Sequence, residues 1–353
     1  MSKICYRYLV KILFVLLAIA IADVDAVNAQ KFTNAGEYIS FIGTQNREIT
    51  KDMMSYMSAV AHGKSARKVE NRRKELSKTT QEAIKKVKGL QPFEGDKTLR
   101  DSTSQYLTKI NHVLNDDYGK IVNMEEIAEQ SYDKMEAYLT AQDMASDKIN
   151  EGGKQLGEIE KKFAEKHKVN LVDSKDDLYA KTKIATEVSN YQRVLYLIFF
   201  KSYKQEAYMM EALSKKDING LEQNKAALLK TSEEGIAKLG PIAPYQKDNT
   251  LKVACRQSLD FYKAESAKIS LLSDFILKEE NFQKIKKAFE LKPQGDRRKE
   301  DVDQYNKATN DFNKAVNEYN NTNNALNAER SKALEGWNKA SANFLDKHTP
   351  KYR

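Results

Sequence analysis

Cysteine is almost absent from this chain of 353 residues, which contains only Cys5 and Cys255. Cys5 precedes the first apolar run, so it does not occupy the position of a lipid-acceptor cysteine, and we do not expect a lipoprotein. Without Cys5, Cys255 has no partner for an intrachain disulfide, even in an oxidising compartment. Packed apolar surface must therefore supply the cohesion of the fold.

Proline is also scarce, with five residues in the whole sequence. Long stretches without a helix breaker, rich in Lys, Glu, Ala, Leu and Gln, favour α-helix throughout. We therefore predict an all-α fold. It should form two tandem helical bundles of about four helices each, with long antiparallel helices.

Signatures of catalysis are missing. The four histidines are not placed in the H-E-x-x-H or E-x-x-H spacing of metal sites. The sequence also lacks a C-x-x-C-H haem motif, a Gly-rich phosphate loop and a G-x-S-x-G elbow. Cys255 falls on the apolar face of its predicted helix, where a thiol usually behaves as a small buried hydrophobe. We expect no enzyme, and no catalytic, metal-binding or cofactor-binding residues.

No long segment carries charge of one sign, although Lys and Arg exceed Asp and Glu by 59 to 50. Acidic residues interleave with basic ones, as in the segment from Glu158 to Lys162. A nucleic-acid binder instead concentrates its cations on one face or in a tail. We expect solvated helix surfaces and no nucleic-acid partner.

The longest apolar run lies near the N-terminus. Lys3, Arg7 and Lys11 precede an apolar run over 12–22, and a polar stretch then ends at Ala29. This is the layout of a cleavable signal peptide. The run is shorter than the roughly 20 residues of a spanning helix, so we prefer cleavage after Ala29 to a retained anchor. We expect an exported protein, in the periplasm or at the cell surface, whose mature chain has no transmembrane span.

The sequence matches itself at a constant offset of 152. Residues 56–107 align with 208–259 without a gap, and 16 of these 52 positions are identical. Farther on, an offset of 181 pairs Tyr138 with Tyr319 and Phe163 with Phe344, which places 29 additional residues in the second copy. Such repetition favours internal duplication. We predict a signal peptide over 1–29, a first helical unit over 30–173, and a second over 174–353 with a longer distal hairpin.

A loop with a proline, an aromatic residue and an aspartate occurs once in each predicted unit. The six positions are Pro92, Phe93 and Asp96 in the first unit, and Pro244, Tyr245 and Asp248 in the second. Proline ends the preceding helix, and the aspartate can cap the next one. We interpret the loops as closures of the bundle ends, with recognition of a partner as the alternative.

A predicted helix capped by Ser174 and running to about Lys215 contains seven consecutive apolar residues over 194–200. A helix that is apolar on all sides is buried all round or meets a partner. Tyr196, Phe199 and Phe200 are therefore candidate interface residues. We expect them to be buried between the two units, with an exposed interaction patch as the alternative.

The last predicted helix, over 300–348, has an aromatic stripe. Tyr305, Phe312 and Tyr319 follow one another at intervals of seven residues. This spacing is typical of a coiled-coil-like seam. It predicts long antiparallel packing of this helix.

Two short motifs carry a family resemblance. The pattern G-E-Y-I-x-F-I-x-x-Q-N at 36–46 and the tail from Phe344 to Lys351 follow an exported start. Together they resemble a family of uncharacterised all-helical envelope and surface proteins of spirochaetes and Bacteroidetes-type bacteria, over most of the mature chain. The resemblance implies placement in the cell envelope or at the surface, and it brings no catalytic residues.

These features favour a non-enzymatic exported protein of the bacterial cell envelope. It would be a structural or partner-binding module whose partner is a protein or another envelope component. The alternative is a binder of a small apolar or haem-like ligand inside or between the bundles. Tyr56, Met57, Tyr208 and Met209 are the candidate lining residues for such a ligand.

Overall fold

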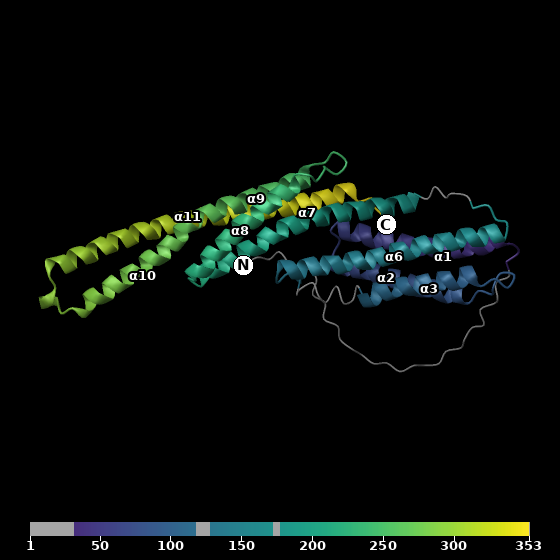
Figure 1. The fold of residues 1–353 in the computed structure, drawn as a ribbon, viewed down its shortest axis with the longest axis horizontal. Helices are drawn as coiled ribbons and strands as arrows, with labels where there is room; N and C mark the ends of the chain where they lie inside the picture. Colours follow the sequence, from purple (N-terminus) through teal and green to yellow (C-terminus); the bar gives the residue numbers. More distant parts are fainter. Residues whose placement is uncertain (1–31, 118–127, 172–176, 353) are drawn as a thin grey trace, which may run out of the picture. The chain divides into compact units, whose positions relative to one another are not determined.

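A computed structural model describes residues 32–117, 128–171 and 177–352. The predicted signal peptide over 1–29, which includes Cys5, and the predicted N-cap Ser174 lie outside the described residues. Within those ranges the regular structure is helical, and β-pairing is limited to isolated bridges in two loops. The predicted all-α fold is confirmed (Figure 1).

The described helices divide into two compact units. The first ends at Ser189 and also takes in the C-terminal segment from Leu345, whereas the second comprises 190–344. The predicted boundary between 173 and 174 differs from this division because helix α7 (Asp177–Ser214) runs through it. The first turns of α7 belong to the first unit, where Leu178 and Ala185 are buried together with Met54.

The first unit contains α1 (Ala35–Ala61), α2 (Ala66–Lys88), α3 (Thr98–His112) and α6 (Tyr132–Lys166). Local capping explains where two of them begin. The Asn34 side chain accepts a hydrogen bond from the Glu37 amide at 2.9 Å, and that of Ser131 accepts one from the Lys134 amide at 3.3 Å. These bonds satisfy amides that the first turn of a helix leaves without partners. A π-helical turn, Val113–Asp117, follows α3.

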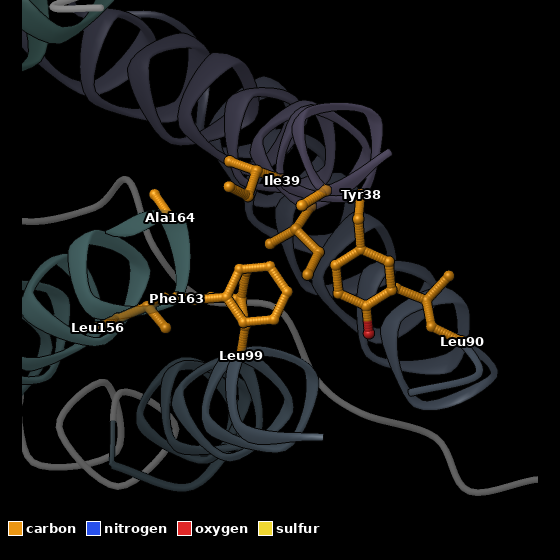
Figure 2. Packing of buried hydrophobic residues seen from close by; sticks show 9 residues of the cluster. Tyr38, Ile39, Leu90, Leu99, Leu156, Phe163 and Ala164 are labelled. Atoms are coloured by element: carbon orange, nitrogen blue, oxygen red, sulfur yellow. The ribbon is translucent and has the colours of Figure 1, made fainter. Parts of the chain in front are cut away.

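One core cluster holds these helices together at the end of the unit where α1 begins. Figure 2 shows how side chains from α1, α3 and α6 converge there with Leu90, which follows α2. The ring of Phe163 stacks on that of Tyr38 with centroids 5.7 Å apart. Each helix contributes residues from one apolar face, as the 3.6-residue period requires.

The second unit contains the rest of α7 with α8 (Ile218–Leu239), α9 (Thr250–Lys268), α10 (Ser270–Leu291) and α11 (Lys299–His348). Ile269 separates α9 from α10, and a short 3₁₀ turn, Gln294–Asp296, joins α10 to α11. Helices α10 and α11 lie side by side as a hairpin (Figure 1). This hairpin occupies the part of the sequence in which the second copy is expected to be longer.

Candidate interaction site

The loop with Pro92 closes on itself and caps α3. Its Asp96 amide donates to the Phe93 carbonyl at 2.8 Å, and the Asp96 carboxylate accepts from the Thr98 amide at 2.9 Å. Glu94 and Gly95 turn the chain with φ angles of 49° and 79°, in the left-handed region. The Asp96 carboxylate therefore accepts a hydrogen bond from the first amide of α3, as its predicted capping role requires.

The loop with Pro244 repeats these bonds. The Asp248 amide donates to the Tyr245 carbonyl at 2.7 Å, and the Asp248 carboxylate accepts from the Thr250 amide at 2.9 Å. Gln246 and Lys247 have positive φ angles of 46° and 70°. Corresponding residues of the two loops thus have the same roles, 152 positions apart.

The aromatic residue of each loop packs against its own unit. The Phe93 ring lies 5.7 Å from that of Tyr38 and 6.3 Å from that of Phe163. The Tyr245 ring lies 5.7 Å from that of Phe344. Both rings are half-buried in these contacts. The arrangement agrees with closure of a bundle end and leaves little of either ring for a partner.

Asp96 also forms an ion pair that makes the first unit sensitive to acid. Its carboxylate accepts from Lys166 Nζ at 2.6 Å, and this contact and the Thr98 amide hold the pKa of Asp96 well below its ordinary value. A carboxyl with a lowered pKa stabilises the fold above its ordinary pKa, and the contribution is lost as pH falls through the lowered value.

Replacing Asp96 with alanine should lower the free energy of unfolding by about 1–2 kcal/mol at pH 7, because the cap and the ion pair are lost together. The difference from the wild type should shrink as the pH falls to about 3. Urea denaturation followed by circular dichroism at both pH values measures it. Asp96→Asn, which keeps the capping oxygen, should cost less; an equal loss in both variants at both pH values would contradict this account.

Two of the three candidate interface residues of α7 lie in the interior of the second unit, and the third is half-buried. Phe199 is 3% exposed, and its ring stacks on that of Trp337 with centroids 4.5 Å apart and planes 14° from parallel. Phe200 is equally buried, and the half-buried Tyr196 stacks on it at 5.4 Å. The prediction that Phe199 is buried between the two units is wrong, because its partner Trp337 belongs to the same unit.

A ladder of aromatic pairs joins α10 to α11. It consists of Phe275 with Tyr319, Phe282 with Phe312, and Phe289 with Tyr305, with ring centroids 4.5 Å apart in each pair. Both series are spaced by seven residues and run in opposite directions, as an antiparallel hairpin requires. The α11 series is part of the predicted stripe. The α10 series has the same spacing in the sequence, so the same search over 275–289 could have found it.

An open groove follows this ladder on one flank of the hairpin. Its volume is about 480 Å³, and its lining comes from α10 and α11. Phe282, Ile285, Ala308 and Phe312 supply the apolar part, and polar side chains such as Lys278, Asn281, Lys307, Asp311 and Glu318 surround it. The lining aromatic residues are only half-buried. We regard this groove as the candidate interaction site.

The described residues contain no group of His, Cys, Asp and Glu side chains arranged to hold a metal ion. Cys255 is fully buried against the Leu195 carbonyl, and burial raises the pKa of its thiol to about 12, so it is not available as a thiolate. None of the helices in the described ranges has both the length and the apolar character of a membrane span.

Comparisons with protein-family models, with curated proteins and with solved structures find no match for this chain. The groove therefore has to be interpreted from its own geometry.

Proposed function

We propose that this chain is a non-enzymatic, exported protein of the bacterial cell envelope that binds an amphipathic helix of a partner protein in the α10–α11 groove. One observation carries the proposal. The aromatic residues of the hairpin seam are only half-buried, whereas Ile276 and Leu326 of the same two helices are almost fully buried. Exposed apolar surface with a polar rim is typical of an interaction site.

The shape of the groove suits a helix. The lining residues of α11 run from Gln304 to Glu318, which corresponds to about 21 Å along the helix axis, or roughly four turns. An amphipathic helix fills such a groove with its apolar stripe and meets the rim with polar residues. The rim carries both signs of charge, from Lys307 and Lys314 and from Asp311 and Glu318. It can therefore pair with a helix that carries both signs as well.

The cellular location rests on the sequence. The leader layout over 1–29 is typical of export, and the resemblance to envelope proteins points to the same compartment. The proposal that the protein is not an enzyme is supported by the missing catalytic motifs and by the buried state of Cys255.

We also infer that the two units descend from one duplicated unit. The matching hydrogen bonds within the two loops support this inference. A further bond is repeated as well: Arg100 donates to the Leu90 carbonyl at 3.0 Å, and Lys252, at the corresponding position, donates to the Ile242 carbonyl at 2.6 Å. The hairpin would then be an addition to the second copy. A binding role for the hairpin agrees with this history, because the described residues of the first unit contain no matching hairpin.

The binding prediction is tested by a photo-activated cross-linking residue at Lys307, in the cells that produce the protein. We expect an adduct with a protein of defined mass, because Lys307 lines the groove. The same residue at Asn310, which is exposed and outside the groove lining, is the control and should not form that adduct. An adduct at both positions, or at neither, would contradict binding in the groove. An adduct of twice the chain mass would identify a second copy as the partner.

Once a partner helix is identified by the cross-link, Phe282→Ser should weaken its binding at least about tenfold, because central aromatic residues dominate such interfaces. Leu271→Ser is the matched control. Leu271 is an exposed apolar residue of the same helix, 54% exposed, and is not part of the groove. Isothermal titration with a synthetic peptide measures both variants. Equal affinity of Phe282→Ser and the wild type would remove the groove from the interface.

The volume of the groove also suits the alternative function, since small-ligand sites measure about 300–1,000 Å³. The site differs from the expected ligand position, because the candidate lining residues Tyr56, Met57, Tyr208 and Met209 are not among the residues that line the groove. Native mass spectrometry and an absorbance spectrum of the protein from its own cells separate the two functions. A stoichiometric small molecule that is lost in Phe282→Ser would favour the ligand binder.

A further inference from the structure

Three charged side chains meet inside the second unit. Glu206 comes from α7, Glu265 from α9 and Arg330 from α11. The Arg330 guanidinium lies 2.5 Å from Glu206 through Nε and donates from Nη2 to Glu265. Glu265 is 0% exposed and Glu206 is 5% exposed. The Arg330 side chain is 20% exposed, so both carboxyl groups are buried and the arginine that joins the three helices is partly buried.

The charges of the cluster do not balance. Two carboxylates face one guanidinium, so full ionisation would bury one net negative charge. The Oε2 atom of Glu265 accepts no hydrogen bond from the described residues, so its negative charge has no other support there. Burial of a charge without a partner costs several kcal/mol, and the usual response is that the group binds a proton.

Among the described residues, the ionisable groups that interact with the cluster include Tyr203 of α7, Tyr262 of α9 and Glu329 of α11, and none of these is a cation. Two lysines of the packed helices are Lys225 of α8 and Lys268 of α9. Lys268 pairs with Glu329 at 3.2 Å, and Lys225 pairs with Glu222 and with Ser270. Each of these lysines already has an acidic partner, so the excess carboxylate stays uncompensated.

The bundle architecture does not need these charges. Extending the offset of 152 pairs Glu206 with Met54 and Glu265 with Val113, and the offset of 181 pairs Arg330 with Ile149. Met54 and Val113 are buried, and Ile149 packs against the core of the first unit. An apolar trio at the matched positions would normally stabilise a bundle as well as a buried ion cluster does, or better. The second unit thus carries the charges for a reason other than packing.

Burial and the nearby Glu206 raise the pKa of Glu265 to about 7, and Arg330 only partly opposes them. Burial raises the pKa of Glu206 as well. A carboxyl whose pKa is raised by folding stabilises the folded state. The stabilisation is fully present at pH values below the ordinary pKa of the carboxyl, and it is lost as the pH rises through the raised pKa. The stabilisation that Glu265 contributes is therefore lost as the pH rises from about 4.5 to about 7.

We propose that Glu206, Glu265 and Arg330 form a proton-binding switch of the second unit, which holds α7, α9 and α11 together when one proton is bound and loosens them when it is lost. With the proton bound, the cluster is neutral and the guanidinium joins all three helices. Without it, two like charges are buried side by side, and the three helices lower the energy by admitting water between them. The second unit is then tighter in mild acid than in mild alkali.

Hydrogen–deuterium exchange of the full chain at about pH 5.5 and pH 8.5, corrected for the intrinsic exchange rate, tests the switch. Peptides that cover Glu206, Glu265 and Arg330 should lose protection by at least about tenfold at the higher pH, since each pKa unit corresponds to a tenfold change. Peptides from α1 and α3 of the first unit provide the internal reference and should change less than twofold.

Glu265→Gln mimics the protonated carboxyl and should keep its protection at both pH values. If this variant loses protection with pH as the wild type does, or if the wild type shows no change, the switch is refuted. The triple variant Glu206→Met/Glu265→Leu/Arg330→Met should fold, and the protection of its amides should not depend on pH, because the cluster is absent.

A measurement without variants is ¹³C NMR of the glutamate carboxyls, which should show one titration midpoint between about pH 6 and 8. Titration of all glutamates below about pH 5.5 overturns the proposal.

Discussion

Replacing Arg330 with methionine is expected to lower the free energy of unfolding of the second unit by about 3–5 kcal/mol at pH 8. The substitution removes the one positive charge between Glu206 and Glu265 and leaves two buried carboxylates close together. The loss should be smaller at about pH 5, where the carboxyls can take up protons, because their pKa values are raised. Urea denaturation at both pH values, followed by the fluorescence of Trp337, measures the effect. Trp337 suits this purpose because it is the single tryptophan of the chain and is buried in the second unit.

The control for this substitution removes the carboxylates as well. Glu206→Met/Glu265→Leu/Arg330→Met should be as stable as the wild type or more stable, since apolar residues of similar volume avoid the desolvation of three charges. A loss below about 1 kcal/mol for Arg330→Met at pH 8 would mean that water already reaches the cluster. A triple variant as unstable as the single one would mean that the loss comes from the Arg330 side chain's packing and not from its charge.

Replacing Phe199 with alanine should destabilise the second unit by about 3–5 kcal/mol. The residue belongs to the apolar segment over 194–200, and its ring packs against those of Trp337 and Tyr203, with centroids 4.5 and 5.6 Å away. Alanine would leave a cavity that these rigid rings cannot close. Circular dichroism during urea denaturation is the suitable measurement, because the substitution also changes the surroundings of Trp337.

Tyr179→Ala is the matched control for Phe199→Ala. Tyr179 is an aromatic residue on the same helix, and it is 72% exposed. Its removal should change the free energy of unfolding by less than about 0.5 kcal/mol. Similar effects of the two substitutions would indicate that α7 is held by its backbone and not by the aromatic core. The contrast therefore tests whether Phe199 is a core residue, as the structure places it, or part of an exposed patch.

The helices themselves were largely predictable from the sequence. The helix predicted over 300–348 agrees with α11 to within one residue at each end, and the helix predicted to run to about Lys215 agrees with the end of α7 at Ser214. Helix ends depend on local signals, such as the proline in the loop after α2. A local signal acts through the backbone of its neighbours, so it can be recognised without knowledge of the fold.

The candidate groove was only half predictable. The stripe of Tyr305, Phe312 and Tyr319 and the equally spaced series on α10 can both be recognised in the sequence, but their pairing depends on which helices lie opposite one another. The interpretation of Phe199 failed for the same reason. An apolar segment shows that a helix is covered, and the sequence does not show by which helix.

By itself, the sequence determined the all-α class, the helix ends and the two capped loops, because residue propensity, capping and the 3.6-residue period act over a few neighbouring positions. Only the tertiary structure decided that Glu206, Glu265 and Arg330 meet in one buried cluster. They are separated by 59 and 65 residues, and each looks like an ordinary surface charge in its own helix. Burial and charge balance are properties of the packed helices, and those properties make the cluster a candidate for a proton switch.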